Sequence, residues 1–139
     1  MSVHFTLVEF VRSKVASENK IDNSIPENLM QNLLFTMAGC ERVRAYLGHA
    51  MTISSGYRCP ELNKIVGGAE NSQHLYAQAV DFICPGYGPP RFIVKALKPM
   101  RFILGIDQLI LERTWVHISF TLQPRYQVLE SVESRFIEI

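Results

Sequence analysis

The sequence places an aspartate, Asp81, inside an otherwise apolar run from Ala79 to Ile83. A short run of this composition predicts a strand that is buried on both faces of a sheet. An ionised carboxylate in such a strand is costly unless it is paired or bound to a metal ion. The fold must therefore bring a metal ion or another partner to Asp81.

Two histidines are partners of the kind that zinc requires. His74 precedes Asp81 by seven residues, and His117 lies further along the chain in the segment TWVHISF. A catalytic zinc usually takes three nitrogen or oxygen ligands from the protein and leaves a fourth position for water. His74, Asp81 and His117 are the predicted metal ligands, although His and Asp pairs at this spacing also arise by chance.

The segments around these residues carry a family resemblance. SGYRCPELN, VGGAENSQHLYAQAVDF and WVHISF, in this order, resemble the zinc D-alanyl-D-alanine carboxypeptidase family, including its short phage-type members. In that family, Ser-x-His with an Asp seven residues after the His carries two metal ligands, and a Trp-x-His strand carries the third. The resemblance runs from about Phe5 to Phe120. The residues that fall on these motifs are Ser72, His74, Asp81, Trp115 and His117.

The resemblance implies a zinc peptidase that acts on peptidoglycan stem peptides, cleaving D-alanyl-D-alanine or another stem-peptide bond. It also implies that Arg58, in SGYR, lies near the scissile bond. Two positions depart from the family pattern. Ala77 stands where the family commonly has Gly, and Thr114 stands where many relatives place the catalytic Glu, three residues before the last His.

A hairpin offers another glutamate, Glu112, as the catalytic base. Strands are expected over Asp107–Glu112 and Trp115–Phe120, and a two-residue turn between them would pair Glu112 with Trp115. Glu112 would then lie diagonal to His117, about 7 Å away at the backbone, where a general base can reach water. Arg-Thr is a poor type I′ turn pair, so a wider loop remains open, as does a solvated hairpin end for Glu112.

Four further residues complete the expected site. Arg58 would bind a substrate carboxylate or carbonyl and stabilise the developing oxyanion, the alternative being a salt bridge within its loop. Ser72 would orient a ligand or contact substrate, and Trp115 would form one wall of the site. Tyr57, beside Arg58, is the third expected substrate contact.

The element pattern predicts an α+β domain with a small antiparallel sheet and N-terminal helices packed on it. The family resemblance implies the same fold, a hedgehog/D-Ala-D-Ala peptidase-like fold with the zinc site on the sheet. Strands are also expected near Met51–Ser54 and Ala79–Ile83, and the tail Pro124–Ile139 leaves room for one more. Helices are expected from Thr6 through Val15, with Thr6 and Glu9 as a capping box, from Ser24 to Leu47, from Pro60 to Val66, and from Arg91 to Leu97.

Composition limits the remaining possibilities. The 139 residues, 47% hydrophobic and 19% charged, predict a single globular domain, residues 1–139. A net charge of +1 with scattered Lys and Arg gives no nucleic-acid footprint. Three cysteines without a signal sequence argue against a disulfide framework.

No segment has the pattern of a signal peptide or the length of a membrane span. The chain is therefore expected to be synthesised in the cytoplasm without a signal peptide. It is also expected to be a monomer. Action on the cell wall as a phage or prophage lysis enzyme (endolysin) fits this, and so does a cytoplasmic dipeptidase. The alternative to an enzyme is a non-catalytic zinc-stabilised binding module of the same fold.

Overall fold

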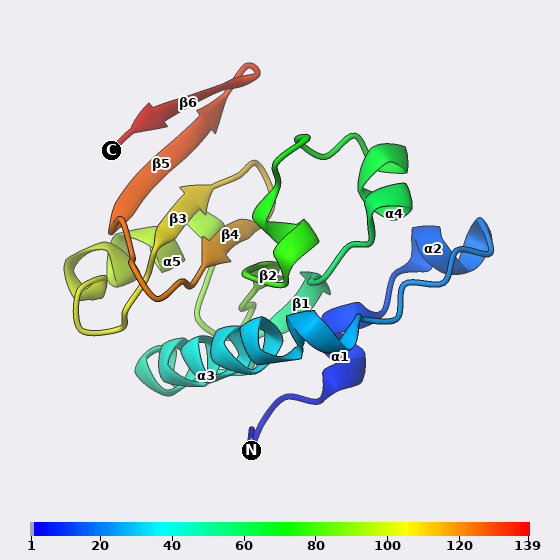
Figure 1. Cartoon of the computed structure of the whole chain (residues 1–139). Helices are drawn as coiled ribbons and strands as arrows, with labels where there is room; N and C mark the ends of the chain where they lie inside the picture. Colours follow the sequence, from blue (N-terminus) through cyan, green and yellow to red (C-terminus); the bar gives the residue numbers. More distant parts are fainter. Residues whose placement is uncertain (1) are drawn as a thin grey trace.

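A six-stranded sheet forms the centre of the computed structural model, which describes residues 2–139. The strand order is β1-β2-β4-β3-β5-β6, with the β5–β6 hairpin at one end of the sheet and β1 at the other (Figure 1). The strands are β1 Thr52–Ser55, β2 Ala79–Ile83, β3 Gln108–Leu111, β4 Val116–Ser119, β5 Gln127–Val132 and β6 Arg135–Glu138.

The sheet is mixed, so the prediction of an antiparallel sheet is wrong at one strand pair. All neighbouring strands are antiparallel except β3 and β5, which run parallel. The chain leaves β4 and passes the end of β3 before it enters β5 on the far side. The backbone N–H of Gln127 donates to the carbonyl of Asp107 there, which sets the start of β5 beside the start of β3.

The tail forms two strands rather than the one that was expected. Val132 pairs with Arg135 across a two-residue turn, Glu133 and Ser134. Both turn residues have positive φ, 46° and 67°, as a type I′ turn requires. Asn and Gly usually mark such turns, and their absence hides this hairpin in the sequence.

The helices lie close to their predicted positions, with two corrections. The first expected helix is two short ones. The chain turns extended at Arg12, which ends the first helix, and Ser13 caps the next by accepting a hydrogen bond from Ala16 N–H. The long helix begins at Met30 rather than Ser24, and it ends before Gly48 as expected. The helices are α1 Leu7–Val11, α2 Lys14–Glu18, α3 Met30–Leu47, α4 Pro60–Ile65 and α5 Pro90–Leu97, with 3₁₀ turns η1 Glu27–Leu29, η2 Gln73–Tyr76 and η3 Lys98–Met100.

Strand alternation separates a core face from a polar face. Val80 and Phe82 of β2 join the hydrophobic core together with Val116 and Ile118 of β4. The same core contains residues of α3 and α5, whereas Asp81, between Val80 and Phe82, points to the other face. The predicted metal ligands on β2 and β4 therefore lie on the face of the sheet away from α3.

Within residues 2–139, no helix combines the length and the apolar character that a membrane crossing needs.

All three cysteines are free thiols, in agreement with the expectation of no disulfide framework.

Candidate metal centre

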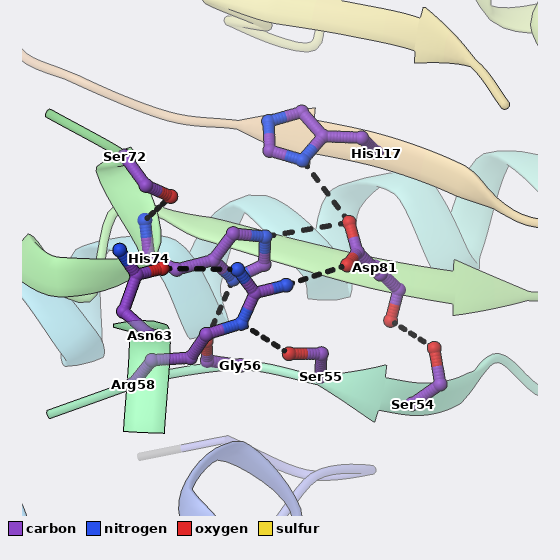
Figure 2. Close-up of polar contacts among 9 residues, drawn as sticks. All are labelled: Ser54, Ser55, Gly56, Arg58, Asn63, Ser72, His74, Asp81 and His117. Carbon is purple, nitrogen blue, oxygen red and sulfur yellow. Dashed lines mark hydrogen bonds and ion pairs between the residues drawn. The ribbon is translucent and has the colours of Figure 1, made fainter. Parts of the chain in front are cut away.

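Asp81 and His117 face each other across two neighbouring strands. Asp81 of β2 pairs in register with His117 of β4. The Asp81 Oδ1 atom lies 3.0 Å from His117 Nδ1 and 3.4 Å from Nε2 of His74, which sits in η2. Figure 2 shows the three side chains converging on one point above the sheet, with α3 behind it.

The donor atoms of this group fit a metal ion. Each of the three residues offers one ligand atom, and these atoms lie within 4.8 Å of one another. Tetrahedral zinc with bonds of about 2.0–2.1 Å separates its ligand atoms by about 3.3 Å. The observed separations of 3.0 and 3.4 Å are close to that value, and two imidazoles with one carboxylate are a usual catalytic zinc set.

His74 is held in the tautomer that a metal ligand needs. Its Nδ1 lies 2.7 Å from the carbonyl oxygen of Gly56. A carbonyl only accepts, so Nδ1 carries the proton and Nε2 presents its lone pair towards Asp81. The ring is only 3% exposed, and this burial lowers the pKa of His74. The neutral imidazole is therefore favoured.

The backbone around His74 explains two motif positions. Ser72 precedes η2, and its hydroxyl accepts a hydrogen bond of 3.2 Å from His74 N–H. Ala77 follows η2 with φ at 57°, in the left-handed region. Glycine adopts that region without strain, which gives a physical reason for a Gly at this position in the family.

Arg58 reaches the candidate ligands from the loop after β1. Its Nη2 lies 3.4 Å from Asp81 Oδ2, its Nε donates to Ser55 and its Nη1 donates to Asn63 (Figure 2). Burial lowers the pKa of Arg58, and the charge of Asp81 opposes that shift. Arg58 therefore forms an ion pair with a candidate metal ligand while it also lines the cavity described below.

Asp81 is ionised in this setting. Burial by itself would raise the pKa of the carboxyl group, but its contacts with the imidazoles of His117 and His74 outweigh that effect and hold the pKa well below its usual range. The carboxylate is thus ready to bind a cation.

The group opens into a cavity of about 620 Å³, a size usual for ligand sites. Tyr57 does not reach the cavity, because its side chain lies in the hydrophobic core and is 4% exposed. Among the residues that line the cavity are Arg58, Ser72, His74, Asp81, Glu112, Trp115 and His117.

Glu112 lies beside this group in the hairpin register that the sequence predicted. Ile110 pairs with His117, and Glu112 N–H donates to the Trp115 carbonyl over 3.1 Å. Burial raises the pKa of Glu112, whereas a hydrogen bond with Ser131 and the charge of His117 oppose that rise. A half-buried carboxylate with a raised pKa is suited to accept and return a proton.

Several neighbouring polar residues were not foreseen. The side chain of Asn63 accepts a hydrogen bond from Arg58, and Gln73 lines the cavity beside Arg125. Asp107, 1% exposed, holds the Arg125 side chain. An acid directly before the apolar strand QLIL was a signal of the same kind as Asp81, whereas nothing local marks Asn63 or Gln73.

Comparison with known proteins places these features in a family. No curated protein matches the chain. The family model described as Peptidase M15 matches residues 3–119, which include all three candidate ligands, Arg58 and Glu112. The match ends before Arg125 and the β5–β6 hairpin. Since the family model matches most of the residues of the chain, the chain belongs to the peptidase M15 family, as the motifs predicted.

Proposed function

We propose that this protein is a zinc-dependent peptidase that hydrolyses peptide bonds of bacterial cell-wall peptides, either D-alanyl-D-alanine or another stem-peptide bond. One observation carries the proposal. Three convergent ligand atoms and the half-buried carboxyl group of Glu112 open into the same cavity. Membership of the peptidase M15 family supports the same reaction class.

His74, Asp81 and His117 would hold the metal ion. When bound, zinc supplies a charge that polarises the scissile carbonyl and makes water a better nucleophile. The chain keeps the ligands oriented through the Gly56 carbonyl on His74 and through Arg58 on Asp81. Such outer contacts typically change metal affinity or activity by about 10- to 100-fold.

Glu112 would accept the proton of the attacking water and return it to the leaving amine. Its position at the end of β3, in the cavity and diagonal to His117, supports this role. The raised pKa of Glu112 brings its proton affinity nearer to neutral pH, where a base that must later act as an acid is most effective.

Arg58 would stabilise the negative charge that develops on the scissile carbonyl. A guanidinium carries five N–H donors, and contacts to Ser55, Asn63 and Asp81 use three of them. Arg58 lines the cavity, and its two remaining donors are available to a substrate there. A fixed donor to a developing oxyanion is worth about 10²- to 10³-fold in turnover. Trp115 would form one wall and Ser72 would contact substrate, while the burial of Tyr57 argues against a direct substrate contact.

The cell wall is the proposed place of action, and a phage or prophage lysis role is part of the proposal. The test is mass spectrometry of the fragments released from purified bacterial sacculi by the zinc-loaded protein, with and without a chelator. We expect chelator-sensitive release that returns when zinc is restored, and the fragment masses identify the bond. Protein that binds one zinc ion and gains thermal stability but releases nothing would instead be the non-catalytic binding module.

A further inference from the structure

A second arginine, Arg125, lines the same cavity from the connection between β4 and β5. It lies beyond the residues that the family model matches. We infer that Arg125 is a specificity-determining residue that binds a carboxylate of the substrate. The inference rests on the proposed peptidase function and adds to it the chemistry of one substrate contact.

Arg125 is held rigidly by a buried acid. Its Nε lies 3.0 Å from Asp107 Oδ1 and its Nη2 lies 2.8 Å from Oδ2, a two-point contact. The backbone N–H of Arg125 donates to the same carboxylate, as do the side chains of Ser119 and Gln73. A guanidinium fixed in this way loses little freedom when it binds a ligand.

The positive end of this ion pair faces the cavity. Asp107 is 1% exposed and is not among the residues that line the cavity, whereas the side chain of Arg125 is 51% exposed. Nη2 also donates to Gln73, and Nη1 has no hydrogen-bond partner within residues 2–139. An incoming anion therefore meets donors of Arg125 while the acid stays beneath them.

The position of Arg125 is within reach of a peptide bound at the metal centre. Gln73, which contacts Arg125, directly precedes His74. Asp107 N–H donates to the carbonyl of Ser119. Ser119 lies two residues after His117 on β4, so these two residues are on the order of 7 Å apart. An extended peptide advances about 3.3–3.6 Å per residue. A carboxylate one or two residues from the scissile bond can thus meet Arg125, at the opposite end of β3 from Glu112.

Two parts of a stem peptide supply such a carboxylate. One is the chain terminus, which would make the enzyme a carboxypeptidase, and the other is a carboxylate on an internal residue, which is compatible with an endopeptidase. The two free N–H groups of Arg125 Nη1 can donate to either carboxylate. The experiment therefore needs probes that remove one source at a time.

The probes are a stem peptide that ends in D-alanyl-D-alanine, the same peptide with its C-terminus amidated, and the same peptide with its internal carboxylates amidated. For the zinc-loaded wild-type protein, we expect one amidation to lower kcat/KM by about 10- to 100-fold, as expected for loss of a charge-assisted hydrogen bond. In Arg125→Gln, the ratio of kcat/KM for the unmodified peptide to kcat/KM for that amidated peptide should fall towards one. Whichever amidation has the effect identifies the source.

Arg91→Gln is the matched control. Arg91 is an exposed arginine whose Nη2 lies 2.9 Å from Glu130 of β5, and it does not line the cavity. Its loss should leave the preference unchanged. If Arg125→Gln misfolds because Asp107 is left buried without its cation, Arg125→Lys carries the test. Lysine retains a charge beside Asp107 but has no second nitrogen in the place of the free Nη1 group, so the preference should still fall.

Equal losses on all three probes in the Arg125 variants, or a wild type that is indifferent to both amidations, would overturn the inference. If the wild type hydrolyses none of the probes, the proposed function fails separately. Calorimetric binding of the same three peptides, without turnover, then makes the same comparison. A preference for the carboxylate that Arg125→Gln removes supports the inference, and equal binding overturns it.

Discussion

Asp81 divides its two carboxylate oxygens between two kinds of partner. Oδ1 faces both histidines, whereas Oδ2 faces Arg58. The division leaves one oxygen directed at the candidate metal position while a fixed positive charge compensates the other. A buried carboxylate with only one of these partners would be markedly less stable.

At the scale of single residues, the sequence predicted those whose chemistry conflicts with their surroundings. Asp81 in an apolar strand and Glu112 at the end of another could be recognised in this way, and the motifs added the histidines. Their functional assignments stay predictions. Gly56 could not be predicted from the sequence, because its role depends on a contact with His74, which is distant in the chain. Asn63 could not be predicted either, because its role depends on the path of the loop that follows it.

Glu112→Gln tests the proton transfer. Glutamine keeps the size and shape of the side chain but removes its basicity, so the variant should bind one zinc ion and fold normally. General acid–base groups contribute about 10²- to 10⁴-fold, and we expect kcat on a muropeptide to fall by at least about 100-fold. Zinc content is measured in parallel, with Glu61→Gln, exposed on α4, as the control. Full zinc with near-normal kcat would remove Glu112 from the mechanism.

Arg58→Lys separates two roles of that arginine. Lysine keeps the positive charge but cannot span Ser55, Asn63 and Asp81 with a planar fork. If Arg58 also faces the reacting carbonyl, kcat should fall by at least about 10-fold even at saturating zinc. A variant with weaker zinc binding but normal kcat at saturation would show that Arg58 acts only through Asp81.

At the scale of elements, the β3–β4 hairpin has the predicted register although its turn sequence is unfavourable. The pairs Gln108–Ser119 and Ile110–His117 are confirmed. Apolar alternation on both strands fixes the register more strongly than the Arg-Thr turn disfavours it, because a one-residue slip would move every core side chain to the polar face. No comparable pattern marks β6, where all four residues are exposed.

The contact of α1 with β1 depends on a glycine at the end of β1. A Cβ on Gly56 would lie 2.9 Å from the carbonyl carbon of Phe10 and closer still to its oxygen. Tyr57 N–H donates to that same carbonyl over 2.7 Å, so the two segments cannot separate without breaking this bond. Gly56 also presents its own carbonyl to His74.

Gly56→Ala should therefore disturb the metal centre from the level of the fold. We expect lower thermal stability and a zinc affinity reduced by about 10-fold or more, because the contact that orients His74 shifts. Gly48→Ala is the control, since Gly48 has φ of 71° but no atom near an added Cβ. Its strain should cost about 1–2 kcal/mol of stability and leave zinc affinity unchanged. Equal zinc affinities in both variants would contradict the prediction.

At the scale of the whole molecule, one face of the sheet packs the core and the other carries ionised groups. The α+β class could be predicted because strong periodic segments specify their own structure. The parallel β3–β5 pair could not, since it depends on the path between β4 and β5, which Asp107 and Arg125 fix through side-chain contacts. That residues 1–139 form one domain, that the chain is monomeric and that the fold is hedgehog-like stay predictions.

Asp107 links this arrangement to pH. Burial by itself would raise the pKa of its carboxyl group, but hydrogen bonds from Arg125, Ser119 and Gln73 outweigh it and hold the pKa well below its usual range. A carboxyl group with a lowered folded-state pKa stabilises the fold fully at pH values above its unfolded pKa, about 3.9. The stabilisation is lost as pH falls below that value towards the folded pKa, because protonation then favours the unfolded chain.

Asp107→Asn should therefore lower the free energy of unfolding most at neutral pH. Hydrogen bonds to a charged group contribute about 1.5–3 kcal/mol, so we expect a loss of about 2 kcal/mol at pH 7 that shrinks as pH falls from 5 to 3. Asp81 has a lowered pKa of the same origin and remains in both proteins, so only the difference between the two curves reports on Asp107. The measurement is urea unfolding of chelator-treated wild type and variant at several pH values between 3 and 7. Parallel stability curves would mean that the ionisation of Asp107 does not stabilise the junction of β3, β4 and β5.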